Sequence, residues 1–267
     1  MNSLSFLARN GNLISLTVAG QGPPLLLLHG FPLDHRQWQE QLSGLAEHFR
    51  VIAPDLRGFG KSTLTEQVYS MGDLADDVEQ VRLHLAGDGP IALCGLSMGG
   101  YVAFEYWRRY SQNLSALVLT NTKPDADDEA GKANRLAMID AAEREGSWSV
   151  VSGLIGKQLT QAHVEQRGAI YHSVEQMMRA CTVEAVCGAL RAMAARSDFT
   201  AALPSITTPT LVIAGEEDPI TPAAATRKWS AMLPNAVCHV IAESAHLTPL
   251  EQPQHFNSRV REFLGSQ

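Results

Sequence analysis

Short apolar runs alternate with amphipathic segments along much of this chain, and that alternation limits the folds open to it. Each run is too short for a typical helix and is bounded by glycine, proline or polar residues, as buried strands are. Because segments with helical spacing separate most of the runs, the pattern predicts an α/β fold with a mainly parallel sheet. We expect strands over residues 13–19, 24–29, 51–54, 91–96, 115–120, 209–214 and 236–242.

The strand pattern is interrupted between Lys123 and Phe199. This segment has apolar residues at helix-like intervals and no plausible strand, so we expect a helical insertion over residues 123–199. The α/β core would then comprise residues 1–122 and 200–267. Within this core, the apolar spacing predicts helices over residues 38–49, 74–85, 98–110, 223–233 and 254–264.

The charge balance and hydropathy exclude several classes of partner. The 267 residues include 21 Lys plus Arg and 28 Asp plus Glu, for a formal net charge of −7 without basic runs. No nucleic-acid partner is expected, because binding a phosphate backbone requires clustered basic side chains. The longest strongly apolar stretch, Pro23–Leu28, is far shorter than the about 20 residues that span a membrane, and no secretory signal is visible. We therefore expect no membrane association and a cytoplasmic location.

The cysteines suggest neither a metal site nor a disulfide framework. They show no C-x-x-C spacing and no paired histidine ligands, so we expect reduced, mostly buried thiols. No ligand spacing for a metal or an organic cofactor is evident elsewhere, and no cofactor is expected. The four cysteines are Cys94, Cys181, Cys187 and Cys238.

Ser97 stands between glycines, directly after the predicted strand 91–96 and before the predicted helix 98–110. This is the strand, G-x-S-x-G, helix context of a nucleophilic serine. The turn is sharp and crowds its neighbours, which requires that Gly95 and Gly99 lack side chains. The helix N-terminus places unpaired N–H groups beside the serine, so the Met98 N–H is a candidate donor to a developing oxyanion.

A serine hydroxyl needs a general base within hydrogen-bond reach and a third group that orients the base. In sheets of this kind the nucleophile, acid and histidine follow in that chain order, which excludes the histidines before Ser97. His246 is the candidate base because it follows the predicted strand 236–242, where sites of α/β folds collect. The remaining histidines fall in the insertion, a strand or the last helix, namely His163, His172, His239 and His255.

The acid is also expected directly after a strand. The strand 209–214 is followed by Glu216, Glu217 and Asp218. Asp218 is the candidate, because the proline after it disfavours helical geometry and holds the carboxylate in an extended loop. Asp125, which follows another predicted strand, is the alternative acid.

The loop His29-Gly30-Phe31-Pro32 follows the strand 24–29 and is expected to supply the second oxyanion donor. Gly30 permits close backbone approach, and Phe31 has an N–H that Pro32 lacks. His29 is interpreted as structural, with its ring hydrogen-bonded to nearby backbone.

These residues together resemble the α/β-hydrolase fold family over essentially the whole chain. The motifs occur in the family's order: the loop 29–32, the loop 55–62, the elbow 95–99, the acidic loop 215–218 and Ala245-His246. The resemblance implies Ser97 as nucleophile, His246 as general base and acid, Asp218 as its orienting carboxylate, and the Phe31 and Met98 amides as oxyanion hole. The insertion resembles the family's helical cap, which shapes the substrate pocket.

Ser97 distinguishes this chain from dehalogenases and epoxide hydrolases of the fold, which use an aspartate at the elbow. The nearest likenesses are small carboxylesterases, enol-lactonases and cofactor-free haloperoxidases. The resemblance therefore implies hydrolysis of small-molecule esters or lactones of small to medium acyl groups through an acyl-enzyme.

Three alternatives remain open at this point. Pro32 resembles the proline of haloperoxidase-like members and could turn the Phe31 carbonyl toward peroxide, which predicts a perhydrolase side activity. A second alternative is a hydrolase-like binding protein with little turnover, and a third is acyl transfer to an alcohol. Methionines of the insertion, Met177, Met178 and Met193 among them, are interpreted as helix packing, with a substrate surface as the alternative.

Overall fold

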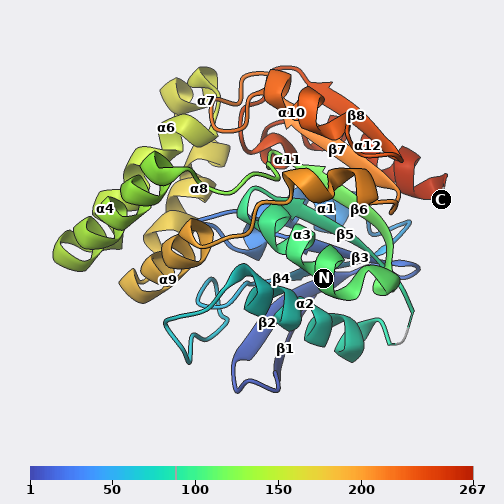
Figure 1. Ribbon diagram of the computed structural model, residues 1–267, viewed down its shortest axis with the longest axis horizontal. Helices are drawn as coiled ribbons and strands as arrows, with labels where there is room; N and C mark the ends of the chain where they lie inside the picture. Colours follow the sequence, from blue (N-terminus) through green and yellow to red (C-terminus); the bar gives the residue numbers. More distant parts are fainter. Residues whose placement is uncertain (88, 267) are drawn as a thin grey trace.

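The computed structural model describes residues 1–87 and 89–266, and one eight-stranded sheet forms its centre (Figure 1). The strand order is β1-β2-β4-β3-β5-β6-β7-β8. The first two strands pair antiparallel, β2 is also antiparallel to β4, and the strands from β4 across to β8 run parallel. The predicted α/β fold with a mainly parallel sheet is confirmed. The strands are β1 (Asn2–Leu7), β2 (Leu13–Ala19), β3 (Pro24–Leu28), β4 (Arg50–Pro54), β5 (Ile91–Leu96), β6 (Leu114–Thr120), β7 (Thr210–Gly215) and β8 (Ala236–Ile241).

Helices connect the strands and cover the sheet. The α-helices are α1 (Gln39–Gly44), α2 (Met71–Leu85), α3 (Met98–Tyr110), α4 (Glu129–Glu145), α5 (Ser147–Val151), α6 (Ile155–Gln158), α7 (Gln161–Gln166), α8 (Ala169–Arg179), α9 (Val183–Ala194), α10 (Ala223–Ser230), α11 (Thr248–Glu251) and α12 (Pro253–Gly265). Short 3-10 turns are η1 (His35–Trp38), η2 (Ser111–Asn113), η3 (Ser152–Leu154) and η4 (Thr200–Ser205).

Two groups of helices enclose the sheet. One group joins α1, α11 and α12, and Trp38 just before α1 contacts Phe256 of α12 with ring centroids 6.0 Å apart. The other joins α2, α3 and α10, where Phe104 and Trp229 lie 6.3 Å apart. Because both faces are covered, β5 is buried along its whole length. This explains why the central strands appear in the sequence as continuous apolar runs.

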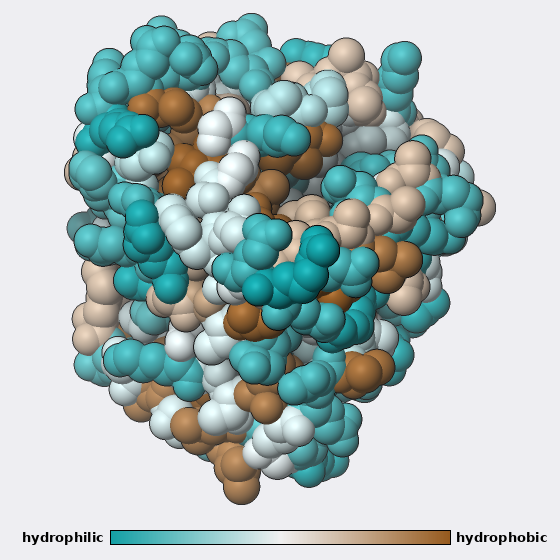
Figure 2. All heavy atoms as spheres, turned by 90° about the vertical axis from the view of Figure 1, so that its left-hand side faces the viewer, coloured by the Kyte–Doolittle hydropathy of each residue, from teal (hydrophilic) through white to brown (hydrophobic). Residues whose placement is uncertain are grey.

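The helices α4 to α9, here called the inserted helices, gather on one side of the sheet, at the left in Figure 1. Between β6 and β7 the structure has helices and loops but no strand, as the apolar spacing predicted. Met177 and Met178 are buried, so they pack the inserted helices, whereas Met193 borders the cavity described below. Figure 2 shows this side of the molecule, where hydrophilic residues cover most of the surface and hydrophobic residues lie between them.

Two parts of the core differ from the sequence predictions. The strand β1 was not predicted, because it is an edge strand that is almost wholly exposed and so carries a weak apolar pattern. The single helix predicted from Trp38 to Phe49 was wrong in extent. The side chain of Asp34 starts a 3-10 turn instead, and α1 ends at Gly44. Trp38 and Leu45 are nonetheless fully buried. The apolar spacing therefore predicted correctly which side chains are buried, but not the length of the helix.

Among the described helices, none has the length and apolar character needed to cross a bilayer.

Candidate active site

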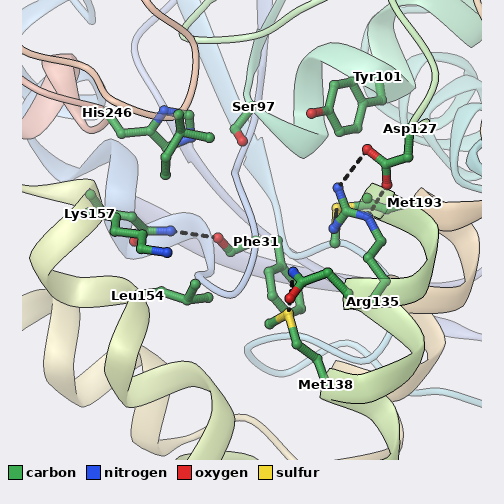
Figure 3. A pocket seen from close by; sticks show the side chains of 14 residues that line it. Phe31, Ser97, Tyr101, Asp127, Arg135, Met138, Leu154, Lys157, Met193 and His246 are labelled. Carbon is green, nitrogen blue, oxygen red and sulfur yellow. Dashed lines mark hydrogen bonds and ion pairs between the residues drawn. The ribbon is translucent and has the colours of Figure 1, made fainter. Parts of the chain in front are cut away.

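Ser97 forms the sharp turn between β5 and α3. Its φ of 53° lies in the left-handed region, an uncommon conformation for a serine and one that is associated with functional strain. A Cβ on Gly95 would lie 2.3 Å from the Gly99 oxygen, and a Cβ on Gly99 would lie 2.3 Å from the Leu28 oxygen. The crowding predicted around this serine is therefore present, and it holds the turn in place. The Ser97 side chain does not cap α3 and lines a cavity (Figure 3).

Asp218 and His246 lie in the loops that follow β7 and β8, and both are buried. The Nδ1 atom of His246 is 2.8 Å from Oδ2 of Asp218. The carboxylate also accepts hydrogen bonds from the Ile220 N–H and from the N–H and hydroxyl of Thr221. Burial alone would raise the pKa of Asp218, but the neighbouring His246 and the hydrogen bonds lower it below its ordinary value. Asp218 therefore stays ionised and can orient the imidazole.

Asn121, at the end of β6, is a partner of this pair that the sequence did not reveal. Its Nδ2 donates to Oδ2 of Asp218 at 2.9 Å and to the Ala245 oxygen at 3.0 Å, so it connects the acidic loop with the loop that carries His246. The backbone φ of 45° places Asn121 in the left-handed region, which asparagine tolerates better than most residues. An asparagine directly after a central strand was the only local signal.

The alternative acids lie elsewhere. Asp125 is about half exposed and pairs with the ammonium of Lys123 at 2.6 Å. Glu216 and Glu217 are exposed to solvent. Of the candidate acids, the structure brings only Asp218 to His246.

The loop after β3 places Phe31 at the same cavity. The Phe31 N–H donates to none of the described residues, and the Met98 N–H, in the first turn of α3, lacks an intrahelical acceptor. His29 is structural, as predicted: its Nε2 accepts the N–H of Leu56 at 2.9 Å. Complete burial lowers the pKa of His29 and favours the neutral ring that this contact requires.

The cavity has a volume of about 250 Å³ and is lined by both the core and the inserted helices (Figure 3). Ser97, His246 and Tyr101 lie along one end. Leu154 and Lys157 border one side, and residues of α4 and α9 border the other, including Arg135, Met138 and Met193.

Gln158, the last residue of α6, joins the inserted helices to both loops of the site. Its backbone oxygen accepts the N–H groups of His246 and Leu247 at 3.0 and 3.1 Å. Its side-chain Nε2 donates to the Phe31 oxygen at 2.9 Å. The partners of Gln158 are far away in the sequence, and the residues around it form no recognisable motif. Gln158 was therefore not predicted from the sequence.

A second connection runs through Glu251, which is buried at the end of α11. One carboxylate oxygen accepts the Thr160 N–H and the other accepts the Ala245 N–H, each at 2.7 Å. The residue before His246 is thereby fixed to the start of α7.

One group of described side chains, Asp34, His35 and Asp55, is close enough together to hold a metal ion. Each member already has a protein partner. Asp34 binds the Arg36 guanidinium, His35 Nδ1 is 2.7 Å from Asp55 Oδ1, and the other Asp55 oxygen accepts the Lys61 N–H. These are the contacts of an ion-pair network that holds the loops after β3 and β4.

A model of the alpha/beta hydrolase fold family matches residues 23–253, and the chain belongs to this family. The 3-oxoadipate enol-lactonase 1 of Acinetobacter baylyi is 28% identical, over 96% of this chain and 94% of the relative. The non-heme chloroperoxidase CPO-A1 of Kitasatospora aureofaciens is 31% identical, over 92% of this chain and 94% of the relative. The malate-bound structure of a thermophilic esterase from Thermogutta terrifontis has a TM-score of 0.95 and 35% identity, and the match covers 100% of this chain and 99% of that one. The resemblance inferred from the motifs is confirmed.

Proposed function

We propose that this chain is a serine hydrolase that cleaves carboxylic esters or lactones of small to medium acyl groups. One observation carries the proposal. Ser97 and His246 line the same cavity, while Nδ1 of His246 is hydrogen-bonded to the ionised Asp218. Nε2 has no hydrogen-bond partner among the described residues and can therefore take the serine proton. The similarity to an esterase and to an enol-lactonase supports the same substrate class.

In this mechanism Ser97 Oγ attacks the carbonyl carbon while His246 takes its proton. The N–H groups of Phe31 and Met98 stabilise the oxyanion, and His246 then protonates the departing alkoxide. Water, deprotonated by the same imidazole, attacks the acyl-enzyme and releases the acid. Residues 123–199 act as a cap in this proposal, which is supported by the lining that Met138, Leu154 and Met193 contribute from this segment.

The first test is hydrolysis of p-nitrophenyl esters of increasing acyl length by the native protein and by Ser97→Ala. We expect the native rate to be highest with short to medium chains, and the substitution to lower it by several orders of magnitude. An organophosphate should label Ser97 in the native protein. A native protein that neither hydrolyses esters or lactones nor reacts with the organophosphate would favour the binding-protein alternative.

Perhydrolysis is a second candidate activity, favoured by the chloroperoxidase relative and by the proline after Phe31. Hydrogen peroxide, deprotonated by His246, would attack the acyl carbon in place of water. The bond to Ser97 Oγ would then break, Oγ would take the proton from His246, and the acyl group would leave as a peracid. The Phe31 oxygen already accepts one hydrogen bond from Gln158, and its second lone pair remains for the peroxide. Pro32→Leu should lower the ratio of peracid to acid formed, and an unchanged ratio would remove this candidate.

A further inference from the structure

Arg135 of α4 lines the cavity and shares the carboxylate of Asp127 with Arg196, which follows α9 and is not among the described residues that line the cavity. Asp127 binds Nη1 of Arg196 at 2.8 Å, and its other oxygen accepts a hydrogen bond from Nε of Arg135. The side chains of Asp127 and Arg196 are 7% and 3% exposed, so solvent screens them weakly. One of the two positive charges is therefore not neutralised by Asp127.

Other acidic groups in the neighbouring loops do not supply the missing negative charge inside the cavity. Among the described residues that line it, Asp127 is the one carboxylate. Asp125 pairs with Lys123, and Asp128 accepts an N–H of α4. Asp198 attracts Arg196, but it is exposed, so solvent screens this attraction, and its carboxylate accepts the Thr200 N–H.

Arg135 has donors to spare on the cavity side. Its Nη1 donates to the thioether sulfur of Met193 at 3.4 Å, and sulfur is a weak acceptor. Its Nη2 is 3.4 Å from the Asp127 carboxylate, a long contact. The two terminal nitrogens carry four N–H groups, so strong donors remain for a ligand. A guanidinium with two such nitrogens matches the two oxygens of a carboxylate.

Lys157 adds a second positive charge across the cavity. It lines the opposite side from Arg135, as Figure 3 shows, and pairs with no acidic side chain among the described residues. The surrounding lining includes Phe31, Leu154 and Met138, which offer no competing charge. The cavity thus places a candidate nucleophile at one end and unneutralised positive charge on its walls.

We propose that this cavity selects esters or lactones that carry a second, anionic carboxylate, and that Arg135 binds this carboxylate while Lys157 attracts it at longer range. This substrate class rests on the proposed function, and the bond cleaved at Ser97 is the same. A neutral substrate leaves the Arg135 donors without an acceptor, so the anionic substrate gains both charge attraction and hydrogen bonds.

The test compares pairs of esters of the same size, one anionic and the other neutral. Phenyl hydrogen glutarate and the phenyl ester of glutaramic acid have the same chain, ending in a carboxylate or an amide. A second pair, 4-carboxyphenyl acetate and 4-carbamoylphenyl acetate, places the same difference on the alcohol side. We expect kcat/KM to favour the anionic member of at least one pair by about tenfold or more, the size of one charge-assisted contact.

The variants assign this preference to the proposed residues. Arg135→Gln should lower the anionic-to-neutral ratio of kcat/KM by about tenfold, and Lys157→Gln by about two- to threefold. Arg191→Gln is the matched control, since Arg191 pairs with Glu143 on the inserted helices and does not line the cavity; its ratio should equal that of the native protein. If Arg135→Gln fails to fold, a second measurement uses Lys157→Gln and competitive inhibition by glutarate, a dianion, and by glutaramate, a monoanion. Relative to the native protein, inhibition of Lys157→Gln by glutarate should weaken more than inhibition by glutaramate.

The outcomes separate this inference from the proposed function. Hydrolysis of the neutral esters with an anionic-to-neutral ratio near one in both pairs would overturn the carboxylate subsite and leave the serine hydrolase intact. A preference that Arg135→Gln and Lys157→Gln leave unchanged would also overturn it. Failure to hydrolyse any of the four esters, together with no labelling of Ser97, would instead overturn the function itself.

Discussion

Gly99 shows how narrowly single residues are constrained at the turn after β5. A Cβ there would meet the backbone oxygen of Leu28 at 2.3 Å, and a backbone atom cannot move aside as a flexible side chain can. We expect Gly99→Ala to lower the free energy of unfolding by about 1–3 kcal/mol, the usual range for overpacking, and to reduce activity with it.

Gly156 is the matched control for this substitution. It lies in α6, and a Cβ added there would meet no atom within 4 Å apart from its chain neighbours and the backbone of its own helix. Gly156→Ala should therefore be neutral or stabilising by up to about 1 kcal/mol. Urea denaturation of the two variants measures the difference. Equal stabilities would contradict the steric account of the turn.

At the scale of elements, α6 couples the inserted helices to the loops that carry Phe31 and His246. Gln158→Leu keeps the size of the side chain but removes the amide that donates to the Phe31 oxygen. The Gln158 Oε1 atom is buried without a partner among the described residues, so leucine also removes an unpaired acceptor. We therefore expect kcat/KM for neutral esters to fall about tenfold while the free energy of unfolding changes little.

Gln161→Leu provides the comparison, because Gln161 is exposed on α7 and its side chain binds Glu165 alone among the described residues. Initial rates and urea denaturation should show no change in activity for this variant. A Gln158→Leu protein with native activity would show that the Gln158 side chain does not position the loop that carries Phe31.

Residues that stand in a local sequence motif were predicted, whereas residues that act through hydrogen bonds to distant parts of the sequence were not. Ser97, Asp218 and His246 stand in short local patterns beside strand ends, and these patterns were enough to select them. Asn121 and Gln158 act through partners far away in the sequence, and their own neighbourhoods carry no comparable pattern. The central strands were predicted because they are buried on both faces, whereas exposed β1 was not.

The stability of the whole molecule should depend on pH through His35. The hydrogen bond to the buried Asp55 raises the pKa of His35 above its ordinary 6.5. A raised folded-state pKa gives stability that is fully present below pH 6.5 and is lost as the pH rises through the folded-state value. The stability difference between the native protein and His35→Gln should therefore be larger at about pH 5.5 than at about pH 8.5.

Urea denaturation at both pH values checks this expectation. His255→Gln, a substitution at an exposed position of α12, is the control for replacing a histidine with glutamine. A difference that is constant with pH, or that grows toward alkaline pH, would contradict the role assigned to the ion pair.

The contacts of Gln158 and Thr160 fasten the insertion to the core at its middle as well as at its two connections. For protein engineering, this argues against exchanging the insertion as a block between relatives. A foreign set of helices would leave the buried N–H groups of His246 and Leu247 without acceptors, and one carboxylate oxygen of Glu251 without the Thr160 donor, at about 1–3 kcal/mol for each lost contact. Grafts confined to α4 and α9 would replace the arginine-bearing wall of the cavity and leave those anchors in place.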